Sequence, residues 1–240
     1  MTAASGGRRR KGMGHMSFNV AIDGPAGAGK STIARAVAKK MNLIYVDTGA
    51  MYRAMTLLVL REGADLQDKE KIVGICRGAK ITIRYEDGEQ VVVLNGENVN
   101  GFLRTEEVGN LTSSVVSRIP EVRERMVKLQ QELAACSDCI MDGRDIGTCV
   151  LPDARLKIYL TASSRVRAMR RYHELLDRGV ESDPEKIQKD IEERDYQDMH
   201  REISPLRQAE DAVLVDTSEM SVEEVISVIS QLCREAGAAP

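Results

Sequence analysis

The chain has 240 residues, of which 42% are hydrophobic and 30% are charged, and its formal net charge at pH 7 is −3. This length fits one large α/β domain, or a core with one or two insertions. With this charge balance we expect no nucleic-acid partner, and any site for a polyanion must be local. No apolar run approaches the ~18 residues of a membrane span and no secretory leader is visible, so we expect a cytoplasmic protein away from membranes.

The first 16 residues have almost no apolar content, so the sequence predicts that residues 1–16 form a disordered tail. The basic run from Arg8 to Lys11 admits a nucleic-acid tail. We favour an artefact instead, either a true start at Met13 or Met16 or a cloning scar. Residues 17–240 are expected to form a single domain.

Five short apolar runs predict a parallel sheet, because acidic or hydroxyl residues follow them and helical patterns separate several of them. The runs are Phe18–Ile22, Leu43–Val46, Cys139–Met141, Leu156–Leu160 and Ala212–Val215. The last helix is predicted to open with a capping box from Ser221 to Glu224. The fold class is therefore α/β, with a doubly wound parallel five-stranded sheet.

Two segments interrupt this alternation. Residues 80–96 alternate apolar and polar side chains around the stretch EDGE, which predicts a β-hairpin within an insertion of residues 64–104. Residues 163–205 are helical and dense in charge, and Pro184 lies in the first turn of one predicted helix. The core thus carries a small antiparallel β unit and a separate helical segment.

The residues that follow the first predicted strand, GPAGAGKS, match the phosphate-binding motif GxxxxGK[ST] in full, between a strand and a helix. Glycines let backbone N–H groups surround a phosphate, which side chains would block. Lys30 is placed to reach the β- and γ-phosphates of ATP, and the Ser31 hydroxyl to ligate Mg²⁺. The predicted ATP-binding residues are Gly24, Pro25, Ala26, Gly27, Ala28, Gly29, Lys30, Ser31 and Thr32.

Two observations narrow the class of P-loop protein: the absence of the GTPase motifs and the position of two arginines. The DxxG and NKxD motifs of a switch GTPase are absent from the sequence. A kinase of a small acceptor needs cations opposite the P-loop, and Arg53 and Arg144 follow the second and third predicted strands. Asp142 is a candidate to support Mg²⁺ indirectly, or else only to orient Arg144. A non-catalytic P-loop binding module is the alternative from a different class, and the arginines disfavour it.

Four stretches, AIDGPAGAGKST, DTGAMYR, DGRDIGTCVLPDA and ERDYQDMHREISPL, resemble bacterial cytidylate kinases in order and spacing. The match runs from about Val20 to the last helix and includes the hairpin insertion, which this family carries in its acceptor-binding region. The resemblance implies a transferase of pyrimidine nucleotide metabolism that moves the γ-phosphoryl group of ATP to CMP or dCMP, with Mg²⁺. We expect a monomer. A kinase of another acceptor (adenylate, guanylate or shikimate) is the runner-up.

The resemblance also implies roles for individual residues. The acceptor phosphate would be held by Thr48, Arg53, Arg144 and Arg201. The cytosine would be read by Ser113, Arg123 and Asp145, with Thr112 and Ser114 as rivals of Ser113. The ribose would be bound by Arg194 and Asp198. The helical region of residues 163–205 would act as a lid, and the catalytic residues would be Lys30, Arg144 and Arg201.

Overall fold

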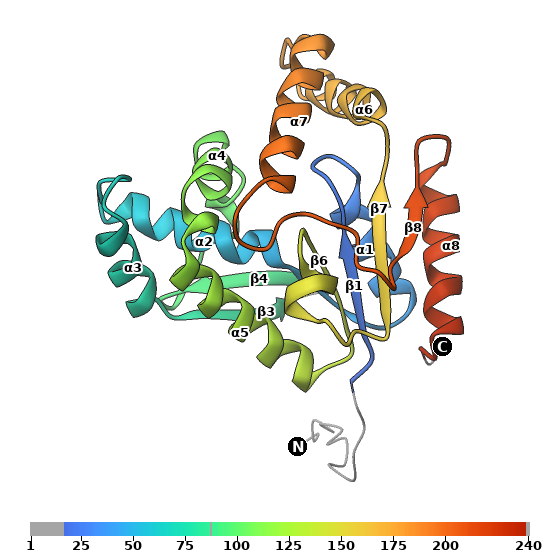
Figure 1. Ribbon diagram of the computed structural model, residues 1–240, viewed down its shortest axis with the longest axis horizontal. Coiled ribbons are helices and arrows are strands. Elements are labelled where there is room, and N and C mark those ends of the chain that lie inside the picture. Colours follow the sequence, from blue (N-terminus) through green and yellow to red (C-terminus); the bar gives the residue numbers. More distant parts are fainter. Residues whose placement is uncertain (1–16, 87, 239–240) are drawn as a thin grey trace, which may run out of the picture.

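The structure is a computed structural model that describes residues 17–86 and 88–238. The expectation for residues 1–16 lies outside the described residues. Five parallel strands form the main sheet in the order β2-β6-β1-β7-β8, and a second, antiparallel sheet has the order β3-β4-β5 (Figure 1). The predicted doubly wound sheet with an inserted antiparallel unit is therefore confirmed.

The elements have the following bounds. The main sheet consists of β1 (Asn19–Asp23), β2 (Ile44–Asp47), β6 (Cys139–Gly143), β7 (Leu156–Thr161) and β8 (Val213–Asp216). The inserted sheet consists of β3 (Ile81–Glu86), β4 (Glu89–Leu94) and β5 (Glu97–Asn98). The α-helices are α1 (Lys30–Lys40), α2 (Thr48–Arg61), α3 (Lys69–Gly78), α4 (Glu106–Ser114), α5 (Pro120–Cys136), α6 (Ser164–Asp177), α7 (Pro184–Met199) and α8 (Val222–Glu235). Short helical turns are η1 (Asn100–Phe102), η2 (Val116–Arg118) and the π-helical η3 (Ile146–Val150).

The core lies on both faces of the main sheet, because successive residues of a strand point to opposite sides. Ala21 and Met141 join an apolar cluster with α2, α5 and the insertion. Val20 and Ile140 join a second cluster with α1 and α8. This double burial explains why the central strands read as near-continuous apolar runs in the sequence.

Carboxylates gather where the parallel strands end. Asp23 and Asp47 are the last residues of β1 and β2, and Asp142 is the second-last residue of β6. The strand register places Asp47 beside Asp142 and Asp23 beside Gly143. Open α/β sheets bind ligands at this edge, so the fold positions the site here.

The insertion packs beside β2 and covers one flank of the main sheet. The predicted hairpin is confirmed by the register of β3 and β4, which runs from Ile81 opposite Leu94 to Glu86 opposite Glu89. The sequence reading did not anticipate α3, whose buried residue Ile72 joins the cluster on the α2 side.

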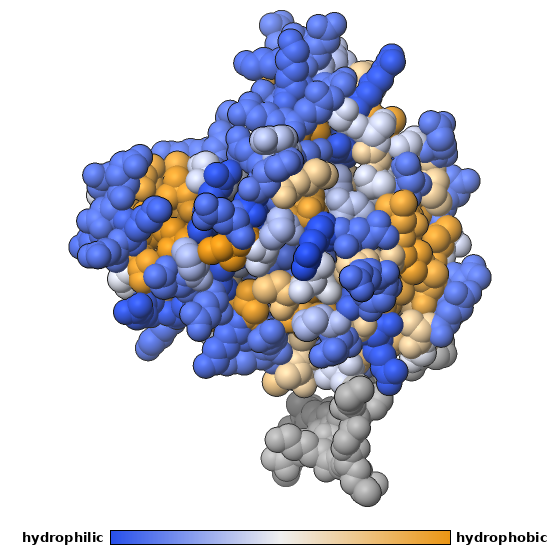
Figure 2. Space-filling model, in the orientation of Figure 1, coloured by the Kyte–Doolittle hydropathy of each residue, from blue (hydrophilic) through white to orange (hydrophobic). Residues whose placement is uncertain are grey.

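Helices α6 and α7 pack against each other above the end of β7 (Figure 1). Ser163 caps α6 and Asp183 caps α7. Pro184 lies in the first turn of α7, as the sequence predicts. Their surface is almost wholly hydrophilic in Figure 2. The capping box of α8 is also confirmed, with Ser221 and Glu224 bonded in both directions. Within the described parts of the chain, no helix is long and apolar enough to cross a membrane.

Candidate active site

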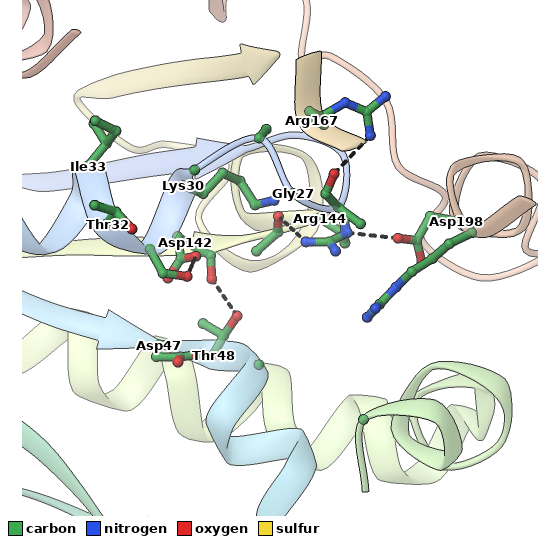
Figure 3. Close-up of a pocket in the computed structure, with 18 of the residues that line it drawn as sticks. Gly27, Lys30, Thr32, Ile33, Asp47, Thr48, Asp142, Arg144, Arg167 and Asp198 are labelled. Atoms are coloured by element: carbon green, nitrogen blue, oxygen red, sulfur yellow. Dashed lines mark hydrogen bonds and ion pairs between the residues drawn. The ribbon is translucent and has the colours of Figure 1, made fainter. Parts of the chain in front are cut away.

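A cavity of about 650 Å³ opens above the carboxyl ends of the strands, between the P-loop, α2 and helices α6 and α7 (Figure 3). Most sequence-predicted site residues line it together. They are Ala26, Gly27, Ala28, Gly29, Lys30, Ser31, Thr32, Thr48, Arg53, Ser113, Arg123, Asp142, Arg144, Asp145, Arg194, Asp198 and Arg201. Gly24 and Pro25 are not among the lining residues. Of the rivals of Ser113, Thr112 lines the cavity and Ser114 does not.

The P-loop requires glycine at two positions for different reasons. A Cβ on Gly24 would lie 2.0 Å from the backbone oxygen of Leu160, so no side chain fits there. Gly29 has a φ of 84°, in the left-handed region, and leads directly into α1. The loop therefore runs close against β7 and then presents the first turn of α1 to the cavity.

Lys30 is held inside this loop. Its side chain is 6% exposed, and its Nζ donates hydrogen bonds of 2.7 Å to the carbonyl oxygens of Gly24 and Pro25. Burial and then the neighbouring positive charge of Arg144 lower the pKa of Lys30 to about 7. Gly24 and Pro25 thus do not line the cavity, but their carbonyl oxygens hold the Lys30 side chain in position beside it.

Oxygen ligands gather beside Lys30. The Ser31 Oγ donates to Asp142 Oδ2 at 2.8 Å, and the Tyr45 hydroxyl donates to Asp142 Oδ1 at 2.9 Å. Burial raises the pKa of Asp142. Thr48 Oγ1 donates to the backbone oxygen of Asp142 at 2.7 Å, as Figure 3 shows. Hydroxyl and carboxylate oxygens are the ligands that Mg²⁺ prefers, so Ser31 and Asp142 fit this ion.

Carboxylates pair with two of the arginines that line the cavity. Arg53 Nη2 lies 3.1 Å from Asp47 Oδ2. Arg144 Nε donates to Asp198 Oδ2 at 2.8 Å, and although burial opposes it, Arg144 holds the pKa of Asp198 below its ordinary value.

A deeper pair lies behind these two. Arg123 pairs with Asp145, and Arg201 Nη2 lies 3.8 Å from the same carboxylate, beyond hydrogen-bond distance. The cavity therefore presents cations that its own carboxylates satisfy only in part.

Three of these arginines keep buried nitrogens without a hydrogen-bond partner among the described residues. The atoms are Arg53 Nε, Arg123 Nε and Arg201 Nη2. Buried donors nearly always have a partner in folded proteins, so these three side chains fit an anionic or carbonyl-bearing ligand in the cavity. All three arginines belong to the set that the sequence assigned to the acceptor.

Asp23, which the sequence reading did not assign, links the P-loop to the turn that follows Asp145. Its side chain is buried, and its two oxygens accept from the backbone N–H groups of Ile146 at 2.8 Å and Gly147 at 2.7 Å. Burial raises the pKa of Asp23 to about 6. An acidic residue directly before the first P-loop glycine was the available signal.

Arg167 and Asp195 form a buried ion pair that the sequence reading also missed. Arg167 Nη2 lies 2.7 Å from Asp195 Oδ2, and Arg167 Nη1 donates to the carbonyl oxygen of Ala26 at 2.8 Å (Figure 3). The N–H of Ala26 donates to Asp195 Oδ1 at 3.3 Å. We call these three residues the lid clamp, because they join α6 and α7 to the P-loop.

Comparison with known proteins gives concordant results. A family model described as cytidylate kinase matches residues 20–235. A cytidylate kinase of Caldicellulosiruptor bescii is 50% identical over 215 residues, which are 90% of this chain and 95% of that one. A cytidylate kinase of Lactobacillus johnsonii is 46% identical over 227 residues, 95% of this chain and 98% of that one. Among solved structures, an uncharacterized protein from Eubacterium ventriosum aligns with a TM-score of 0.52 at 9% identity, over 91% of this chain and 99% of its own, a likeness of fold alone.

Proposed function

This chain belongs to the cytidylate kinase family. On that premise we propose which residues of its cavity bind ATP, which support the metal and which bind the acceptor. The protein is an ATP-dependent kinase that transfers the γ-phosphoryl group of ATP to CMP or dCMP, giving CDP or dCDP and ADP. The observation that carries the division of roles is the set of orphaned buried donors on Arg53, Arg123 and Arg201. An acceptor nucleotide offers phosphate and carbonyl oxygens that can satisfy them.

On the donor side, residues 24–32 bind ATP. The backbone N–H groups of the loop and the first turn of α1 receive the β-phosphate, and Lys30 exchanges its bonds with Gly24 and Pro25 for phosphate oxygens. Ser31 would ligate the metal, which we propose to be Mg²⁺, and Asp142, which accepts from the Ser31 hydroxyl, would support it indirectly. When bound, it neutralises charge on the transferring phosphates.

On the acceptor side, roles follow position in the cavity. The phosphate lies among Thr48, Arg53, Arg144 and Arg201. The cytosine is read by Arg123, Asp145 and Ser113, and the ribose is bound by Arg194 and Asp198. Arg144 and Asp198 pair with each other in this structure, so substrate binding replaces their mutual bond with bonds to the nucleotide.

Phosphoryl transfer then needs positioning and charge neutralisation rather than a strong base. The acceptor phosphate is already anionic and attacks in line with the leaving group. Two phosphates repel each other unless cations stand between them, and Lys30, Arg144 and Arg201 supply these cations. Helices α6 and α7 act as a lid that excludes water and so prevents hydrolysis of ATP.

An ADP-release assay over a panel of acceptors tests these roles. Arg53→Ala is expected to lower kcat/KM for CMP, dCMP and UMP by the same factor, because phosphate carries no base identity. Asp145→Ala is expected to lower the ratio of kcat/KM for CMP over UMP, because the carboxylate accepts from the cytosine amino group and uracil has a carbonyl there. Arg84→Ala, an exposed change on β3, serves as the control.

An unchanged CMP/UMP ratio in Asp145→Ala contradicts the base-reading role. Faster turnover with AMP, GMP or shikimate than with CMP in the wild-type protein contradicts the acceptor itself. We further propose that the protein acts as a monomer in the cytoplasm, which size measurement in solution and cell fractionation test directly.

A further inference from the structure

Strand β2 lies at the edge of the main sheet, so within the described part of the chain one side of its backbone has no neighbouring strand. The inserted sheet covers this side with side chains instead. The Tyr85 hydroxyl donates to the backbone oxygen of Tyr45 at 2.9 Å. Two residues further along β2, the Gln90 amide accepts from the Asp47 N–H at 2.7 Å and donates to the Asp47 carbonyl at 3.2 Å.

Gln90 makes these bonds from a buried and well-held position. Its side chain is 9% exposed, and its own backbone oxygen accepts from Asn100 Nδ2 at 2.7 Å. It does not belong to the lining of the cavity. The Gln90 side-chain amide thus bonds both the backbone N–H and the backbone carbonyl of Asp47. These two bonds hold Asp47 in place in the way that the backbone of a neighbouring strand would.

The residue that Gln90 holds is the one that orients Arg53. Asp47 Oδ1 accepts from the N–H of Ala50, which caps α2, and Asp47 Oδ2 pairs with Arg53 Nη2. Arg53 lies one and a half turns into that helix, and both Asp47 and Arg53 line the cavity. The position of Asp47 therefore sets the start of α2 and the direction of the guanidinium together.

We propose that Gln90 is a positioning residue for the acceptor phosphate, acting through Asp47 on Arg53. This inference rests on the proposed role of Arg53 in binding that phosphate. The insertion thereby contributes to acceptor affinity from behind the site, through a side chain that does not touch the acceptor.

Binding measurements with a double-mutant cycle test the inference. Gln90→Met removes both bonds at similar length, and its Kd for CMP is expected to rise about tenfold, the loss expected of two buried hydrogen bonds. The rise should be equal for CMP, dCMP and UMP, with the Kd for ATP unchanged. Tyr85→Phe, which removes the neighbouring bond to β2 but not those to Asp47, should leave the Kd for CMP unchanged.

The cycle uses Arg53→Ala as its second arm. If Gln90 acts through Arg53, Gln90→Met should change the Kd for CMP by less than about twofold in the Arg53→Ala background. Circular dichroism reports folding of every variant. Gln90→Glu keeps the bond from the Asp47 N–H and loses the bond to the Asp47 carbonyl. If Gln90→Met does not fold, Gln90→Glu replaces it in the double-mutant cycle.

The outcomes separate the inference from its premise. Full additivity in the cycle, an equal loss of ATP affinity, or an unchanged Kd for CMP overturns the role of Gln90 while the role of Arg53 stands. An Arg53→Ala variant that binds all monophosphates normally overturns the proposed role of Arg53, and the inference with it.

Discussion

Burial opposes charge on two residues at opposite ends of the P-loop. Asp23 precedes the first glycine and Lys30 follows the last, and loss of solvent raises the pKa of the first and lowers that of the second. Backbone hydrogen bonds offset part of the cost of burying each charge. Asp23 accepts from two backbone N–H groups, and Lys30 donates to two backbone carbonyl oxygens. Bound ATP changes this balance for Lys30, because phosphate oxygens favour the charged ammonium.

Lys30→Ala is expected to lower kcat by about a hundredfold or more, the loss seen when a main electrostatic stabiliser of a transition state is removed. The fold should survive, because Lys30 bonds only to carbonyls of its own loop. Measurement of ADP release together with circular dichroism checks both statements. Lys40→Ala, an exposed change at the end of the same helix, is the control. Near-normal turnover, or an unfolded variant, would contradict the assignment.

Asp23 should also make stability depend on pH. Its pKa is raised from 3.8 to about 6, so between these values the folded chain holds more protons than the unfolded chain and stability falls as pH rises. The nearby charge of Asp145 raises this pKa and that of Lys30 lowers it. The full shift corresponds to about 3 kcal/mol of unfolding free energy.

Urea unfolding between pH 4 and pH 7 measures this effect. Over this range the difference in unfolding free energy between the wild-type protein and Asp23→Asn should decrease by about 2 kcal/mol as pH rises, because the amide does not ionise and the unfolded carboxyl is already largely ionised at pH 4. Asp153→Asn, at an exposed position, should show no such trend. Parallel pH profiles for the wild-type protein and Asp23→Asn would rule out a buried, titrating Asp23.

At the scale of elements, the lid clamp divides helices α6 and α7 into an anchored and an exposed part. Arg167 and Asp195 are buried against the P-loop. The turn of residues 178–183 that joins the two helices is largely exposed. Beside it, Arg171 in the last turns of α6 and Arg178 just after α6 both pair with Glu174 on the surface. Surface pairs of this kind contribute little, so if the two helices close over bound nucleotides as proposed, we expect the exposed part to move and the clamp to stay in place.

Hydrogen exchange tests this division. A non-hydrolysable ATP analogue together with CMP should slow amide exchange in α6 and α7 most strongly around residues 175–187. The segments beside the clamp should change less, since they are already protected, and strands β1 and β6 should not change. Equal exchange with and without nucleotides across both helices would show a rigid, ion-paired surface in place of a lid.

Local patterns predicted most elements of this fold. The apolar runs, the P-loop, the hairpin and the capping box of α8 each depend on residues within one short stretch, and the structure contains all of them. The partners of the site residues depend on packing between distant stretches. Arg167 is one of many arginines in a charge-dense region, and only its contact with Ala26, 141 residues away, distinguishes it. Gln90 likewise reaches Asp47 across 43 residues.

At the scale of the whole molecule, the main sheet separates two apolar clusters that support different parts of the protein. The cluster on the α2 side supports the insertion and the acceptor arginines. The cluster on the α1 and α8 side contains Ile229, which is fully buried and does not line the cavity. Damage at Ile229, which lies away from the cavity, should therefore affect stability far more than catalysis.

Ile229→Ala is expected to lower the unfolding free energy by about 3 kcal/mol, the usual loss for a large aliphatic side chain in a packed core. The neighbouring change Val228→Ala, at a position that is 39% exposed, should cost well under about 1 kcal/mol. Both variants should keep wild-type kcat/KM at temperatures where they are folded. A large loss of kcat/KM in folded Ile229→Ala would show that α8 transmits its packing to the site.

The continuity of the cavity has a consequence for synthetic ligands. It runs without interruption from Val222 at the start of α8, past Lys30, to Ser113 near the end of α4. An adenosine and a cytidine joined through a chain of phosphates could occupy this length as one molecule. Such a tethered compound loses translational freedom once rather than twice, and its first-bound end presents the second at a local concentration in the ~millimolar range. Selectivity would come from the cytidine end alone, because other P-loop kinases share the cradle that receives the adenosine end.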